Sequence, residues 1–172
     1  MKMATTSAVQ PQSVASFVAP QVYPFLAADY VVLHAAIAAA GGKRLVSDPR
    51  AAGEAYEKHG PAFTAWFHGE PLAAAGLCLS TPGWSRATAW VILSPRLRRL
   101  PRAALWFVEE VRTRLDALMV EHNLLRVEAD VREGHATGGA FVAALGFTLE
   151  ATSPCWGPKG ETFLRYVKMR RP

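Results

Sequence analysis

The stretch His135–Phe147, HATGGAFVAALGF, decides the fold of this chain together with the segments that flank it. Its small and apolar residues predict a short helix over 136–145, and Gly146 stands where a helix commonly ends in a residue with positive φ. Before it, Leu125–Val131 alternates apolar and charged residues, which is typical of a half-exposed strand. After it, two strands joined by a Gly-Pro-Lys-Gly turn predict a closing hairpin.

The rest of the chain supplies further helices and strands in an order that indicates the fold class. Apolar residues recur at spacings of three and four over 101–121, which predicts a long helix. This helix separates the strands 86–93 and 125–131, so we expect a crossover that makes these two strands parallel and lets them diverge near Leu93. The other predicted elements are helices over 27–40 and 49–58 and strands over 61–67, 72–80, 147–152 and 162–169. This order predicts an α+β, or mixed α/β, fold whose central sheet is mostly antiparallel.

Composition favours one globular domain over residues 21–172 that follows a polar, flexible tail over 1–20. Hydrophobic residues make up 51% of the 172 residues and charged residues 19%. The longest apolar run, Tyr30–Ala40, is far shorter than the roughly 20 residues that span a bilayer, and no signal peptide is visible, so we expect a cytoplasmic protein without membrane contact. Cys78 and Cys155 lack metal-site spacing, and Cys78 is expected to be a buried thiol.

Positive charge is concentrated in two places, Arg96–Arg102 and Arg165–Arg171, in a chain with a formal charge of +5. Such clusters suit the phosphates of a nucleotide cofactor or a nucleic acid, and they also occur as solvated basic surface. Because the chain contains no recognised nucleic-acid-binding motif, nucleic acid is the least favoured of these partners.

The element order, together with the Leu-Gly-Phe ending at Phe147, resembles the GNAT acetyltransferase superfamily across about residues 22–170. The resemblance implies the acyl-CoA N-acyltransferase fold, acetyl-CoA as cosubstrate and transfer of acetyl to a primary amine on a small molecule or protein. In that family the pyrophosphate binds backbone N–H groups at a glycine-rich helix start. The matching segment here is Leu93–Ala103, where Arg98 and Ala103 fit the motif while Arg99 and Pro101 replace glycines.

The resemblance assigns a cofactor site to the end of strand 86–93 and the turn that follows. The strand end would pair with the pantetheine amides, and added arginine charge would compensate for the lost glycines. The residue that replaces the family's asparagine lies beyond the next strand. The implied cofactor-binding set is Ile92, Leu93, Ser94, Arg98, Arg99, Arg102, Ala103 and His135.

The proton-handling residues of the family are missing at their usual places. The usual tyrosine is Val142, and strand 86–93 carries no glutamate that could act as a base. Tyr166, on the last strand, and Ser94, at the cofactor strand end, are the remaining candidates for catalytic proton transfer.

A narrower similarity is to divergent acetyltransferase-like proteins of bacteriophages and prophages, some of them internal virion proteins. It implies an alternative in which the fold is catalytically silent and serves as a structural virion or host-interaction protein with a phage or host protein partner.

Overall fold

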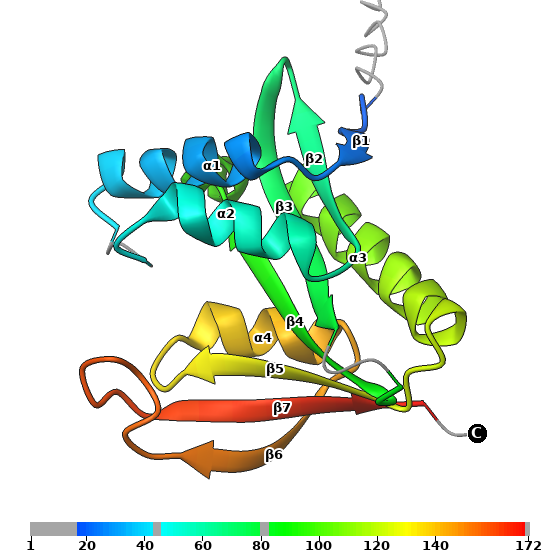
Figure 1. The fold of residues 1–172 in the computed structure, drawn as a ribbon. Helices are drawn as coiled ribbons and strands as arrows, with labels where there is room; N and C mark the ends of the chain where they lie inside the picture. The colour runs from blue at the N-terminus through cyan, green and yellow to red at the C-terminus, as the bar shows by residue number, and fades with distance from the viewer. Residues whose placement is uncertain (1–16, 43–45, 80–82, 171–172) are drawn as a thin grey trace, which may run out of the picture.

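The computed structural model describes residues 17–42, 46–79 and 83–170, and its centre is one seven-stranded sheet (Figure 1). The strand order is β1-β2-β3-β4-β5-β7-β6, in which only β4 and β5 are parallel neighbours. The mixed sheet with one parallel pair confirms the predicted fold class. The strands are β1 (Gln21–Pro24), β2 (Ala62–Phe67), β3 (Glu70–Leu79), β4 (Arg86–Leu93), β5 (Arg126–Arg132), β6 (Thr148–Ser153) and β7 (Phe163–Met169).

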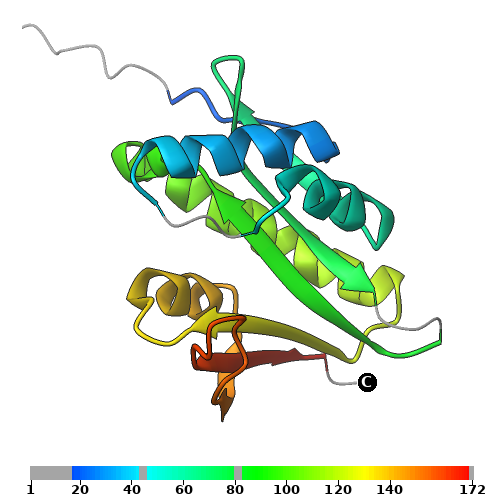
Figure 2. The same cartoon turned by 60° about the vertical axis from the view of Figure 1, so that its left-hand side comes forward.

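Two helices, α1 (Ala27–Ala39) and α2 (Pro49–Lys58), pack on one face of the sheet over β3 and β4 (Figure 2). Asp48 begins α2, because its carboxylate accepts the N–H groups of Arg50 and Ala51 at 3.0 Å and Pro49 fits the first turn. The apolar layer beneath the two helices is buried and consists of Phe25, Tyr30, Leu33, Ala74 and Ile92.

The long helix α3 (Pro101–Glu121) covers the opposite face, and its bounds match those predicted from the apolar spacing. Phe107, Val111, Leu115 and Met119 are all buried, so one residue per turn faces the sheet. This layer continues onto β5, where Val127 and Ala129 are buried while Arg126 and Glu128 point to the other face.

The helix α4 (Ala136–Ala144) joins β5 to β6 and shares the α3 core, because Phe141 stacks on Phe107 with ring centroids 6.3 Å apart. Gly146 follows α4 with φ of 88°, a conformation that glycine adopts without steric cost. The strand β6 lies at the edge of the sheet, and its register shifts between Leu149 and Ala151.

Two short elements were not predicted from the sequence. Gln21–Pro24 forms the edge strand β1, paired with β2 from Gln21↔Trp66 to Pro24↔Phe63, and Pro95–Arg99 forms a 3₁₀ helix, η1, between β4 and α3. Part of the predicted tail, residues 1–16, lies outside the described residues.

Candidate functional site

The parallel strands β4 and β5 form a fork (Figure 1). They pair at only three positions, from Arg86↔Arg126 to Thr88↔Glu128, and then separate. The prediction of parallel pairing is confirmed, but the divergence begins after Thr88 rather than near Leu93. The β4 backbone from Ala89 onward therefore has no strand partner on this side within the described chain. Backbone N–H and C=O groups here are free to bind an extended ligand.

The helix α3 begins at the open end of this fork without a side-chain cap. Pro101 has no N–H, and the N–H of Ala104 already donates to the carbonyl of Leu100 at 2.9 Å. The N–H groups of Arg102 and Ala103 remain as the donors of the first turn. They coincide with the positive end of the helix dipole, which favours an anion.

Arginine side chains surround this helix start. Arg98 and Arg99 are the last two residues of η1, Arg102 is the second residue of α3, and all three are exposed. None of the three forms an ion pair with the residues that the structure describes, whereas Arg96 pairs with Glu70. Three guanidinium groups without an ion pair among the described residues thus lie near the backbone N–H groups of Arg102 and Ala103.

The predicted cofactor-binding residues at the end of β4 have side chains that are buried or half-buried. Ile92 is buried under α1 and α2, and Leu93 is half-buried beneath η1 and α3. Ser94 is 3% exposed, and its hydroxyl caps η1 by accepting the N–H of Arg96 at 3.3 Å. The proton of the Ser94 hydroxyl stays available for donation. The catalytic role of Ser94 stays a prediction.

His135 lies at the other arm of the fork, where β5 leads into α4. Its side chain is exposed, and its ring folds over Gly138, since a Cβ built there would lie 2.4 Å from His135 Nδ1. The structure thus places His135 and the arginines on the two strand ends that flank the opening. In open α/β sheets, ligands commonly bind between the carboxyl ends of parallel strands.

Tyr166 lies one strand farther out, on β7, opposite Ala129 of β5. Its hydroxyl approaches α4, because a Cβ built on Gly139 would lie 3.2 Å from it. Val142, at the family's tyrosine position, is 7% exposed in the shared core. A tyrosine at residue 142 would overpack that core, so the position is structural in this chain.

Two carboxylates beside the fork were not predicted from the sequence, because they lie on β5 and not on β4. Glu128 closes the last β4–β5 pair, and Asp130 follows two residues into the opening. Arg165 binds Asp130 with two hydrogen bonds of 2.9 and 3.1 Å, which raise the pKa of its guanidinium. Arg126 donates to Glu128 at 2.7 Å. The alternation of charged and apolar residues along β5 could have predicted that these carboxylates share one face of the sheet.

An aromatic cluster lies on the α1/α2 face of β4. Trp90 stacks on Tyr56 with centroids 4.4 Å apart, and its buried indole N–H has no hydrogen-bond partner among the described residues. Burial raises the pKa of Tyr30 to about 12, and it also raises the pKa of Tyr56. An unpaired buried donor costs free energy.

The C-terminal basic cluster has structural partners. Arg165 pairs with Asp130, Lys168 with Asp116, and Arg170 donates to the carbonyl of Leu124. Cys78 was expected to be a buried thiol but is only partly covered, and this partial burial raises the pKa of the thiol. Within the described ranges, no helix has the length and hydrophobicity to cross a membrane, and no three or more His, Cys, Asp or Glu residues are grouped so that they could hold a metal ion.

The fold is similar to that of solved GNAT acetyltransferases. The protein yncA of Salmonella typhimurium, solved with its cofactor acetyl-CoA, superposes with a TM-score of 0.64 at 16% identity, covering 87% of this chain and 92% of that one. A spermidine N-acetyltransferase from Vibrio cholerae gives 0.65 at 12% identity, with coverage of 87% and 94%. A ribosomal-protein-alanine N-acetyltransferase from Brucella melitensis gives 0.64 at 18%, with 87% and 99%. No protein-family model and no curated protein matches the sequence.

Proposed function

We propose that this GNAT-fold chain is an acetyl-CoA-dependent N-acetyltransferase that acts on a primary amine. The observation that carries the proposal is the fork between β4 and β5, which ends at an uncapped helix start with three arginines that form no ion pair with the described residues. A nucleotide thioester has an extended amide arm and a phosphate group, and these two features need the two kinds of donor found there.

The residues present fit acetyl-CoA. The backbone of Ile92 and Leu93 would hold the pantetheine amides, and the N–H groups of Arg102 and Ala103 would hold the pyrophosphate. Ser94 would contribute its hydroxyl rather than its backbone, because its N–H donates to the carbonyl of Leu72 at 2.9 Å and its carbonyl accepts the N–H of Leu97 at 3.0 Å. The side chains of Arg98, Arg99 and Arg102 replace part of the binding that glycines supply elsewhere in the family, and His135 would bind from the opposite arm. When bound, acetyl-CoA supplies the activated thioester carbonyl.

Proton transfer must be supplied by groups of this chain. The attacking amine has to lose a proton, and Asp130, with Glu128 beside it, is the proposed acceptor because both carboxylates border the fork and are held by arginine. The departing thiolate has to gain a proton, for which Tyr166 and Ser94 are the proposed donors. A positioned acid or base contributes typically about 10²–10⁴-fold in rate.

The acceptor side is proposed to be the α1/α2 face of the fork. The aromatic rings of Tyr56 and Trp90 lie on this face. The solved structures of similar fold include enzymes named for spermidine and for the alanine of ribosomal proteins, so polyamines and peptides with N-terminal alanine are the first acceptors to assay.

Calorimetric titration with acetyl-CoA tests the cofactor site. The native chain should bind, and the triple variant R98A/R99A/R102A should bind at least about tenfold more weakly, since a charge-assisted hydrogen bond contributes about 1.5–3 kcal/mol. The charge-matched control R50A/K58A/R112A removes three exposed cations elsewhere and should keep most of the affinity. Equal losses in both triples would mean that only net charge matters.

Acetyl transfer to a broad amine panel tests the chemistry. Asp130→Asn should lower kcat by about 10²-fold or more, and Tyr166→Phe should do so if the phenol is the acid. The alternative is a silent fold member that serves as a virion or host-interaction protein. It is favoured if the native chain binds acetyl-CoA and acetylates nothing, or does not bind it.

A further inference from the structure

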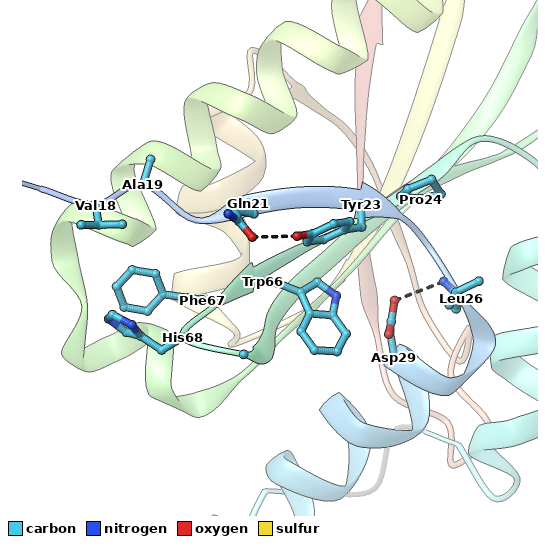
Figure 3. A pocket seen from close by; sticks show the side chains of 11 residues that line it. Val18, Ala19, Gln21, Tyr23, Pro24, Leu26, Asp29, Trp66, Phe67 and His68 are labelled. Atoms are coloured by element: carbon cyan, nitrogen blue, oxygen red, sulfur yellow. Dashed lines mark hydrogen bonds between the residues drawn. The ribbon is translucent and has the colours of Figure 1, made fainter.

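A cavity lies at the β1 edge of the sheet, away from the fork. Its volume is about 740 Å³, within the range of small-molecule sites, and it lies between β1, the start of α1 and the β2–β3 turn (Figure 3). Two strands, β2 and β3, separate β1 from β4. At about 4.8 Å per strand, β1 is roughly 14 Å from the cofactor strand, too far to present an amine to the thioester.

Aromatic rings form two walls of this cavity. Tyr23 and Trp66 meet edge to face, with centroids 6.4 Å apart and planes at 84°, so they make a corner with two π surfaces. Tyr23 is 48% exposed, and its hydroxyl is turned to Gln21 Oε1 at 2.7 Å. Phe67 and His68 line the neighbouring wall, with centroids 4.1 Å apart.

A buried carboxylate completes the corner. Asp29 is 5% exposed and lines the cavity, and Figure 3 shows it beside Trp66. One of its oxygens, Oδ2, accepts the Thr64 hydroxyl at 2.6 Å and the Leu26 N–H at 3.2 Å. The other oxygen, Oδ1, accepts no hydrogen bond from the described residues. The same fixed carboxylate thus holds the start of α1 and keeps one oxygen for a ligand.

We propose that this cavity binds a small organic ammonium ion. A cation is attracted to the faces of Trp and Tyr rings and to a carboxylate, and partial desolvation strengthens both attractions. The exposed side chains of Val18 and Leu26 supply the apolar rim that suits the alkyl groups of such an ion. The chain as a whole has a formal charge of +5 and repels cations, so attraction of a cation has to come from the local carboxylate and aromatic rings.

Nuclear magnetic resonance titration with choline tests the proposal, with 3,3-dimethylbutan-1-ol as its neutral isostere. The chain has five tryptophans, so the Trp66 indole signal, identified with Trp66→Phe, can be compared with four internal controls. Choline should shift the Trp66 and Gly69 signals in a saturable way, and the isostere should bind at least about tenfold more weakly. The titration contains no acetyl-CoA, so its result is independent of the proposed function.

Two variants separate the charge from the rings. Asp29→Asn keeps one oxygen that can accept both the Leu26 N–H and the Thr64 hydroxyl, and it should weaken choline binding about tenfold or more. Tyr23→Leu should weaken binding while leaving the carboxylate. Asp48→Asn, at the start of α2, is the matched control and should not. Equal binding of choline and its isostere, unchanged affinity in folded Asp29→Asn, or no saturable shift would overturn the proposal. So would shifts of these signals on protein dilution alone, which would place a second copy of the chain there.

Discussion

The two halves of the sheet are stabilised in different ways. The strands β2 to β4 lie between α1 and α2 on one side and α3 on the other, whereas β5 and β7 have helices on one face alone (Figure 2). The edge strand β6 is exposed along nearly its whole length. On the open face of these three strands, Arg126, Glu128, Asp130, Glu150 and Arg165 form a network of ion pairs. Burial of apolar side chains stabilises the first half, and ion pairs cover the open face of the second.

This difference explains why chemistry can concentrate at the junction. A face closed by apolar side chains has little room for polar groups, while an ion-paired face keeps carboxylates in place and hydrated. The fork lies where one type of face gives way to the other, so the free backbone of β4 borders the carboxylates of β5.

The largest contrast should come from matched leucine substitutions. Leu33, on the sheet-facing side of α1, is fully buried, and Leu149 is 56% exposed on β6. Leu33→Ala should lower the free energy of unfolding by about 2–5 kcal/mol, because it leaves a cavity. Leu149→Ala should change it by no more than about 0.5 kcal/mol. Urea denaturation of both variants measures this, and similar losses would contradict the division between the halves.

The ion-paired face should show a smaller, salt-dependent effect. A double-mutant cycle with Asp130→Ala and Arg165→Ala should give a coupling of roughly 1 kcal/mol, since the pair is bidentate but partly exposed. The coupling should shrink in about 1 M salt, where charges are screened over roughly 3 Å. A coupling that salt leaves unchanged would indicate packing rather than charge.

High pH should destabilise the first half through Tyr30. Its pKa is raised by burial to about 12 from the ordinary 10.0, so between these values the unfolded chain loses a proton that the folded chain keeps. Stability therefore falls as pH rises through this window, by at most about 1.4 kcal/mol per pH unit for one group. Thermal melts should show a flatter alkaline limb for Tyr30→Phe, and the exposed Tyr23→Phe serves as the control.

Low pH should weaken the second half slightly through Glu150. The hydrogen bond from Arg126 holds the pKa of Glu150 below its ordinary 4.5. This contribution is present above about pH 4.5 and is lost as pH falls through the lowered value. Glu150→Gln should therefore make stability less dependent on pH between about 5 and 3. Glu121→Gln, at the exposed end of α3, should leave the acid limb as it is.

The sequence predicted those elements whose side chains repeat with the period of their structure. Phe107, Val111, Leu115 and Met119 lie one turn apart, and Leu125–Val131 alternates, so α3 and β5 were found with bounds correct to within one residue. The strand β1 was missed because its four residues have no alternation, and pairing with β2 imposes their extended form.

The candidate site was predictable only in part. The arginines after β4 and His135 after β5 could be placed from the element order, and the structure puts them on the two arms of the fork. The point of divergence depends on the relative twist of two strands, which no residue pattern encodes. The cavity could not be predicted from the sequence, because its lining residues come from segments far apart in the chain. Asp29, for example, is held by Thr64, which lies 35 positions later.

The irregularity of β6 has a consequence for how copies of this chain behave when concentrated. An edge strand exposes unpaired backbone groups on which another chain can add a strand, and this is a common route to aggregation. Here the shift between Leu149 and Ala151 breaks the edge and leaves the charged Glu150 in the break. At the opposite edge, β1 has four residues and ends at Pro24, which has no N–H to offer. Both rims of the sheet are thus poor templates for a fibril.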